Sequence, residues 1–216
     1  KIGHAYLFCG TRGTGKTTCA KVFSRAVNCL NNKNGSPCNE CEICRGIIDG
    51  SIMDVTEIDA ASNNGVEDIR GIKEDVNYVA SAAKYTVYII DEVHMLSNAA
   101  FNALLKTLEE PPEHVIFILA TTEPHKVPQT ILSRCQRFDF KRIKNSDIIV
   151  RMKEIAYGDG LDISDDAYEL LAHLADGSMR DALSYLERVV SARGGRVTAA
   201  DITDTLGIST LDTTYS

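Results

Sequence analysis

The sequence predicts an α/β domain built on a parallel sheet, followed by a small helical domain. Three observations predict this fold class. A glycine-rich loop lies between a predicted strand and a predicted helix, apolar runs then alternate with helical patterns, and strand patterns cease after about residue 142. Alternating strands and helices are typical of a parallel sheet that helices cover on both faces. We therefore expect an α/β domain at residues 1–142 and a helical domain at residues 143–207.

The first predicted elements surround the glycine-rich loop. Residues 5–9 (AYLFC) are an apolar run typical of a buried strand, residues 10–17 read GTRGTGKT, and residues 16–29 have helical spacing. A strand, a glycine loop and a helix in this order predict a phosphate-binding loop, because backbone N–H groups and the helix N-terminus converge there. A chance glycine-rich turn is the alternative. The residues expected to contact a nucleotide are Gly10, Thr11, Gly13, Thr14, Gly15, Lys16, Thr17 and Thr18.

Within that loop, two side chains have separate expected roles. Lys16 is expected to reach the β- and γ-phosphates, and the Thr17 hydroxyl is expected to be a ligand of Mg²⁺.

A cysteine-rich insert at about residues 29–44 follows the first helix. Four of the seven cysteines have the spacing Cys-x8-Cys-x2-Cys-x2-Cys, with a turn-rich stretch at residues 31–37. Four thiolates at this density suit tetrahedral Zn²⁺, and with no open ligand position the site is expected to be structural. A redox dithiol and a disulfide pair are the alternatives. The expected zinc ligands are Cys29, Cys38, Cys41 and Cys44.

The next predicted elements are a strand at residues 55–58, a helix at 66–83 and a strand at 87–91. The last strand ends in Asp91 and Glu92. In a doubly wound sheet the C-terminal end of such a strand lies beside the phosphate loop. We therefore expect Asp91 to hold Mg²⁺ together with Thr17, and Glu92 to polarise an attacking water. A pair of solvated acids at a strand end is the alternative.

The last elements of the α/β domain are a helix at residues 98–110, a strand at 115–120, a short helix at 128–132 and a strand at 138–140. Two prolines, at positions 111 and 112, end the long helix. Arg134 follows the short helix, far along the chain from the phosphate loop. The spacing alone is equally compatible with an ordinary surface arginine.

The helical domain is predicted to hold four helices. Ser146, Ser164 and Thr198 are expected to cap three of them. Arg180 opens the remaining helix, where it could reach a γ-phosphate across a cleft or be an ordinary charge on a helix surface.

The composition limits the possible function classes. The 216 residues carry a net charge of −7, so a global basic field for nucleic acid is absent. Contact with DNA would need a local patch or an assembly. No apolar stretch approaches the ~18 residues of a membrane span, and no signal peptide is expected.

These motifs together resemble the AAA+ ATPases and, more narrowly, the clamp-loader subunits of bacterial DNA polymerase III. The phosphate loop is shared by many ATPases, whereas the cysteine insert combined with Ser133-Arg134-Cys135 is far more specific. The other matching segments are residues 4–8, 90–96, 101–112, 120–124 and 177–181.

The resemblance implies roles for single residues. Thr122 resembles sensor 1, which detects the γ-phosphate, and Arg180 resembles sensor 2 on the helical lid. Arg134 resembles the arginine finger, which acts on ATP held by the neighbouring subunit. The implied catalytic set is Lys16, Asp91, Glu92, Thr122, Arg134 and Arg180, and the implied cofactors are ATP, Mg²⁺ and Zn²⁺.

The resemblance also implies partners. These are other clamp-loader subunits in a hetero-oligomeric ring, the sliding clamp, and primer–template DNA bound through its backbone, all in the bacterial cytoplasm and with no membrane. Arg70 and Lys106 are candidate DNA contacts, although solvated charges fit them equally well. The chain would serve a nucleotidyltransferase holoenzyme without polymerase chemistry of its own. A branch-migration helicase, a non-hydrolysing scaffold and a zinc module that reads nucleic acid are the alternatives.

Both ends of the chain suggest a piece of a longer protein. The chain starts almost on the first predicted strand, and the family has an earlier segment that helps to form the adenine pocket. Residues 208–216 are expected to begin the family's third domain, a helical collar.

Overall fold

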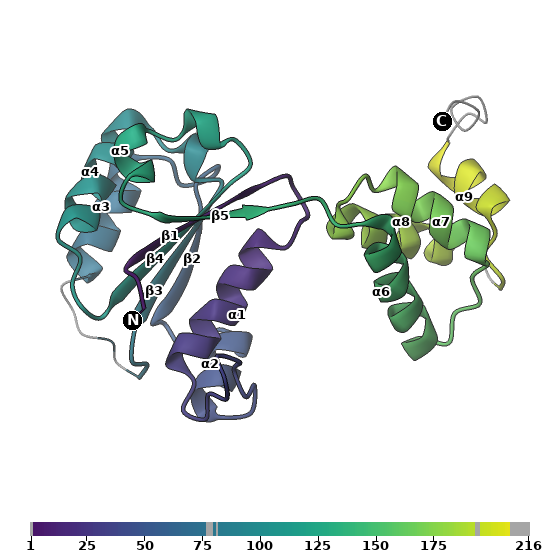
Figure 1. Ribbon diagram of the computed structural model, residues 1–216, viewed down its shortest axis with the longest axis horizontal. Helices are drawn as coiled ribbons and strands as arrows, with labels where there is room; N and C mark the ends of the chain where they lie inside the picture. Colours follow the sequence, from purple (N-terminus) through teal and green to yellow (C-terminus); the bar gives the residue numbers. More distant parts are fainter. Residues whose placement is uncertain (1, 77–79, 81, 193–194, 208–216) are drawn as a thin grey trace. The chain divides into compact units, whose positions relative to one another are not determined.

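The computed structural model describes residues 2–76, 80, 82–192 and 195–207 (Figure 1). These residues group into two compact units, one formed by residues 2–10 and 15–140 and the other by residues 11–14 and 141–207. The expected start of a collar domain at residues 208–216 lies outside the described residues. The domain limits at 142 and 143 stay predictions.

The described residues of the first unit form five strands and seven helical segments. The strands are β1 (Ala5–Gly10), β2 (Val55–Asp59), β3 (Thr86–Asp91), β4 (Val115–Thr121) and β5 (Gln136–Phe140). The α-helices are α1 (Lys16–Asn28), α2 (Glu42–Asp49), α3 (Val66–Asp75), α4 (Asn98–Glu109) and α5 (Gln129–Leu132), and the 3₁₀ helices are η1 (Val93–Met95) and η2 (Pro124–Lys126).

The strands form one sheet in the order β2-β3-β4-β1-β5. All four pairings are parallel, so the five carboxyl ends lie at the same edge. The predicted parallel sheet is confirmed. Four strands lie where the apolar runs predict them, and β5 begins two residues before the strand predicted at 138–140. Because β1, β4 and β3 are neighbours, the segments that follow these three strands meet at one place.

Helices cover both faces of this sheet (Figure 1), with α3, α4 and α5 on one face and α1 on the other. Strand side chains alternate between two separate cores, as the pleat requires. Leu7 and Leu119 belong to the core with α3 and α4, whereas Phe8 and Ile118 belong to the core with α1. Each fully buried side chain of this size contributes about 1.5–3 kcal/mol by leaving water.

Helix α3 is shorter than predicted. It ends at Asp75, so the predicted extension to residue 83 is wrong for Ala82 and Ala83, while residues 77–79 and 81 lie outside the described residues. The cause is Asp54, whose carboxylate accepts hydrogen bonds of 2.8 Å from the N–H groups of both alanines. Those N–H groups therefore serve a turn that leads into β3 and not a helix.

Helix α2 was not predicted. It starts inside the cysteine-rich insert, where the sequence suggests only turns. Its N-cap is Cys41, whose sulfur accepts a hydrogen bond from the N–H of Cys44. Cysteine is not among the residues that usually signal a helix start, which explains why the pattern did not reveal this helix.

The second unit is helical, as predicted. The helices that the structure describes there are α6 (Asn145–Gly158), α7 (Asp165–Leu174), α8 (Met179–Ala192) and α9 (Ala199–Leu206). Their apolar faces share one core, which includes Met152, Leu171 and Leu186. None of the helices within the described ranges combines the length and the apolar character that a bilayer crossing needs.

Two of the three predicted caps lie at the predicted helix ends. Thr198 forms a capping box with Asp201, and Ser164 is the N-cap of α7, although its hydroxyl donates to the carbonyl of Val197. The Ser146 cap is wrong, because the N–H of Ile148 bonds to the carbonyl of Lys144 and the helix therefore starts one residue before the serine.

Candidate functional site

The backbone of the phosphate loop has glycine-specific conformations, as Gly10 and Gly15 show. Gly10 has φ 155°, and a Cβ there would lie 2.4 Å from the carbonyl oxygen of Phe140 on the neighbouring strand β5. Gly15 is the N-cap of α1 with φ 92°, in the left-handed region. Both positions allow the chain to leave β1 and enter α1 within a few residues, which directs the helix N-terminus toward the strand ends.

Lys16, Thr17 and Asp91 meet at the carboxyl edge of the sheet. The Thr17 hydroxyl donates a 2.6 Å hydrogen bond to Oδ2 of Asp91, although the two residues lie 74 positions apart in the sequence. The Lys16 side chain is 6% exposed, and its ammonium donates to the carbonyl of Gly10 at 2.9 Å. A hydroxyl beside a carboxylate offers the oxygen ligands that Mg²⁺ prefers, so the donor set fits this cation.

The tip of the loop belongs to the second unit. Residues 11–14 group there, where the carbonyl of Gly13 accepts a hydrogen bond of 3.1 Å from the N–H of Met179. Thr14 is buried, and its hydroxyl donates to the carbonyl of Thr11 at 2.8 Å. Thr18 is exposed on α1. The nucleotide contacts expected of these residues stay predictions.

Glu92 and Thr122 are in direct contact. The Thr122 hydroxyl donates to Oε2 of Glu92 at 3.0 Å, and the N–H of Glu92 donates to Oδ1 of Asp91 at 2.9 Å. Glu92 has φ 47°, a left-handed conformation that is uncommon for a residue with a side chain. Thr122, which follows β4, thus holds Glu92, which follows β3. The expected base and the expected sensor therefore form one hydrogen-bonded pair.

Sequence reasoning missed three residues at the same edge. His94, Thr121 and Glu123 are linked to one another and to Glu92. The Lys126 ammonium, which donates to Glu123, holds the pKa of that carboxyl below its usual value. The only signal in the sequence was that His94 comes two residues after Glu92.

The two arginines differ in their relation to the phosphate loop: the described partners of Arg134 lie elsewhere, whereas the Cβ of Arg180 would lie 3.3 Å from a Cβ added to Gly13, in the second unit. Arg134 forms an ion pair of 2.7 Å with Glu109 of α4 and donates to the carbonyl of Thr130 at 2.9 Å. Arg180 lies exposed in the first turn of α8, in the second unit. Their expected catalytic roles stay predictions.

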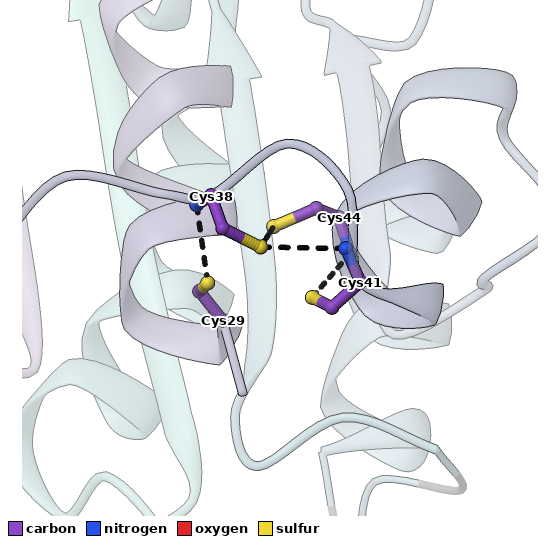
Figure 2. A group of neighbouring side chains, drawn as sticks. All are labelled: Cys29, Cys38, Cys41 and Cys44. Atoms are coloured by element: carbon purple, nitrogen blue, oxygen red, sulfur yellow. Dashed lines mark hydrogen bonds between the residues drawn. The ribbon is translucent and has the colours of Figure 1, made fainter. Parts of the chain in front are cut away.

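The four cysteines of the insert converge, as Figure 2 shows. Their sulfur atoms all lie within 4.8 Å of one another, and the cluster draws on the end of α1, the following loop and the start of α2. A tetrahedron with Zn–S bonds of about 2.3 Å has edges of about 3.8 Å. The cluster therefore fits a structural zinc ion with four thiolate ligands.

Backbone donors already stabilise negative charge on this cluster. The N–H groups of Cys38, Cys41 and Cys44 lie 3.3–3.4 Å from cysteine sulfur atoms (Figure 2). Desolvation acts to raise the pKa of Cys41, but hydrogen bonds, above all from the N–H of Cys44, outweigh it and lower the pKa to about 6. Burial raises the pKa of Cys44 to about 12, so this thiol needs a bound cation to lose its proton near neutral pH.

Asn28 anchors the cluster to the sheet. Its buried side chain accepts a hydrogen bond from the N–H of Tyr85 at 2.7 Å and donates to the carbonyl of Tyr85 at 3.1 Å. Tyr85 directly precedes β3, and Cys29 directly follows Asn28. The amide thus fixes the point at which the chain leaves α1 and enters the cysteine cluster.

We expect one zinc ion per chain. Native mass spectrometry of reduced protein should show a mass increase of one Zn²⁺ that is lost in Cys41→Ser, because three thiolates bind the ion less tightly than four. Cys19→Ser is the matched control, since Cys19 is an exposed cysteine outside the cluster, and it should keep the metal. Metal-free wild-type protein would contradict the expectation.

Family models match both units. Residues 1–144 match the family described as "DNA polymerase III, delta subunit", and residues 147–195 match "DNA polymerase III clamp loader subunit, ATPase lid domain". The chain is 62% identical over 194 residues to DNA polymerase III subunit tau of Bacillus subtilis, which covers 90% of this chain and 34% of the relative. It is 46% identical over 212 residues to subunit tau of Escherichia coli, which covers 98% of this chain and 33% of the relative. The chain thus spans about a third of these curated relatives.

Solved structures support the fold. The Thermotoga maritima RuvB Holliday junction branch migration motor has a TM-score of 0.64 at 19% identity, over 95% of this chain and 61% of that one. At this identity the likeness shows a shared fold and carries no argument about function.

Proposed function

Because this chain belongs to the gamma/tau family of bacterial DNA polymerase III clamp-loader subunits, we propose that it is the part of such a subunit that binds and hydrolyses ATP. The hydrolysis would drive loading of a sliding clamp onto primed DNA. The observation that carries the proposal is the 2.6 Å contact of Thr17 with Asp91, beside the buried Lys16. This is the donor set of a magnesium–nucleotide site in a phosphate-loop ATPase.

Each residue of this site has a task in the proposed reaction. Bound Mg²⁺ would neutralise charge on the phosphates, and Thr17 and Asp91 are the residues that would hold it. The Lys16 ammonium would give up its hydrogen bond to the carbonyl of Gly10 and donate to phosphate oxygens. Glu92 would accept the proton of the attacking water, while Thr122, now bonded to Glu92, would sense the γ-phosphate.

The remaining parts of the proposal concern the assembly. Arg134 would complete the site of a neighbouring subunit, and Arg180 would contact the γ-phosphate from the lid. Other clamp-loader subunits, the sliding clamp and primer–template DNA are the proposed partners, in a bacterial cytoplasm. The cysteine cluster would hold Zn²⁺ as a structural ion. The chain would contribute no nucleotidyl transfer, since no residue of the site is assigned to that chemistry.

Rival functions have less support. A branch-migration helicase shares the fold, but relatives named DNA polymerase III subunits match at 45–62% identity, against 19% for the branch migration motor. A non-hydrolysing scaffold would not need Lys16, Thr17, Asp91 and Glu92 to be present and in place.

The test is the ATPase rate of the full-length protein assembled with its clamp-loader partners. We expect the rate to rise strongly when sliding clamp and primed DNA are added together, because the reaction is coupled to release of a loaded clamp. Each component alone, and unprimed DNA, are the controls. A rate that does not respond to clamp and primed DNA would contradict the clamp-loading proposal and leave a generic ATPase.

The candidate DNA contacts Arg70 and Lys106 line one shallow depression between α3 and α4. Both are exposed, and Arg70 pairs with Glu67. We expect the double variant Arg70→Ala/Lys106→Ala, tested in the assembled loader, to bind primed DNA more weakly and to lower the salt slope by about one per lost phosphate contact.

Filter binding at several salt concentrations measures both quantities. Arg151→Ala is the matched control, since Arg151 forms a similar ion pair with Glu154 at a spacing of three residues. An unchanged affinity and slope in the double variant would remove both residues from the DNA surface.

A further inference from the structure

We propose that His94 is a positioning residue that holds Glu92 in place for the activation of water. The inference rests on the proposed ATPase function and deepens it. His94 lies in η1, directly after the acids that end β3, and its side chain is 6% exposed. A histidine this buried needs partners for its polar ring atoms, and the partners it has are residues of the catalytic edge.

The imidazole joins two strand ends. Its Nδ1 lies 3.0 Å from Oγ1 of Thr121, at the end of β4, and 3.5 Å from Oε2 of Glu92. Its Nε2 lies 3.1 Å from Oε2 of Glu123. Three side chains, one from the end of β4 and two from the segments after β3 and β4, therefore surround one ring.

The hydrogen bonds of this network are mutually compatible. The Thr121 hydroxyl oxygen already accepts the N–H of Glu123 at 3.0 Å, so its proton is available to Nδ1 of His94. With Nδ1 as acceptor, Nε2 carries the ring proton and donates it to Glu123. Both ring nitrogens are thus occupied, so the 3.5 Å approach of Nδ1 to Glu92 is a packing contact and not a hydrogen bond, and the ring lies fixed beside that carboxylate.

Glu92 depends on such support for two reasons. Its left-handed backbone, at φ 47°, persists only where the surroundings enforce it. Among the described residues, the hydrogen bond that holds its carboxylate comes from the Thr122 hydroxyl at 3.0 Å, and one such bond leaves a glutamate free to rotate about it. The His94 ring packs against the carboxylate and limits this rotation. Loss of a positioning contact costs up to about 10²-fold in rate when a reacting group moves by about 1 Å.

The first experiment measures single-turnover ATP hydrolysis by the full-length protein in the assembled loader. We expect His94→Ala to lower the rate by on the order of 10² while the Kd for ATP and the Tm stay close to wild type. His94→Asn should recover part of the rate, because its amide reaches the position of Nδ1 next to Thr121. His125→Ala is the matched control, since this exposed histidine also faces Glu123, at 3.9 Å, and it should keep the wild-type rate.

The second experiment asks whether His94 acts through Glu92. In a Glu92→Gln background, where the rate is already low, His94→Ala should cause no further loss. An equal loss in both backgrounds, a wild-type rate in His94→Ala, or parallel losses of ATP affinity and Tm would each overturn the inference. If the wild-type loader does not hydrolyse ATP, the proposed function fails and the inference with it. If Glu92→Gln keeps the wild-type rate, Glu92 is not the base and the inference fails while the ATPase function stands. If Glu92→Gln is inactive and His94→Ala is not, the inference alone fails.

Discussion

Replacing Arg134 with alanine is expected to lower the ATP hydrolysis rate of the assembled loader by about 10³–10⁵, while the same subunit continues to bind ATP. The reason is that Arg134 contacts no residue of its own phosphate loop among its described partners, which are Glu109, Thr130 and Ser133. Its side chain is 35% exposed, so a neighbouring subunit could reach it. There a fixed positive charge would stabilise the transition state of phosphoryl transfer.

The measurement is steady-state ATPase with clamp and primed DNA, together with the Kd for ATP. Arg137→Ala is a matched control, because Arg137 is also an exposed arginine with one acidic partner, Asp139 at 2.8 Å, and it should leave the rate unchanged. An Arg134→Ala loader that hydrolyses ATP at the wild-type rate would exclude an arginine finger at this position.

A mixing experiment separates action in trans from action in cis. Subunits with Lys16→Ala keep Arg134 but have an inactive ATP site. Subunits with Arg134→Ala keep an intact ATP site but lack the arginine finger. In rings where copies are neighbours, mixed assemblies should regain part of the activity that either variant lacks alone. If Arg134 served its own site, no mixture would be active.

Replacing Lys16 with alanine is expected to abolish hydrolysis and to weaken ATP binding by about 10–100-fold. The binding loss corresponds to one charge-assisted contact of about 1.5–3 kcal/mol, and the loss in rate adds the missing transition-state charge. The ammonium is buried against the carbonyl of Gly10, so no other lysine can take its place without a change of the loop.

Lys21→Ala is the matched control for this variant. Lys21 lies on the same helix, is half-exposed and forms an ion pair with Glu57, so its loss should change neither ATP binding nor the rate. Fluorescent-nucleotide titration measures binding, and phosphate release measures hydrolysis. Unchanged ATP binding in Lys16→Ala would contradict the proposed role of the loop.

The strands were predictable because a parallel sheet covered on both faces requires apolar side chains on both sides of each strand. The runs at β1, β3 and β4 satisfy this requirement almost without interruption, and their burial is nearly complete. Helix ends were less predictable. The end of α3 depends on Asp54, which accepts hydrogen bonds from the N–H groups of Ala82 and Ala83. Asp54 is distant from these alanines in the sequence, so a local pattern does not predict the contact.

The site was predictable where one local motif carries the chemistry. The phosphate loop and the acids after β3 each have a recognisable context, and the rule that parallel strands present their carboxyl ends together places Lys16, Thr17 and Asp91 at one edge. The His94 network had no such context. Its members come from the segments after β3 and β4, and only the pairing of these two strands brings them together.

The sequence by itself thus determined the fold class, the strand positions, the phosphate loop and the four cysteines, since each follows from side-chain periodicity or spacing along the chain. Tertiary structure alone decided that Thr122 binds Glu92, that His94 lies between Glu92 and Glu123, and that Arg134 pairs with Glu109. These contacts depend on strand order, on register and on where each loop returns to the sheet edge. Those features are set by the packing of the whole unit, and no segment of the chain encodes them separately.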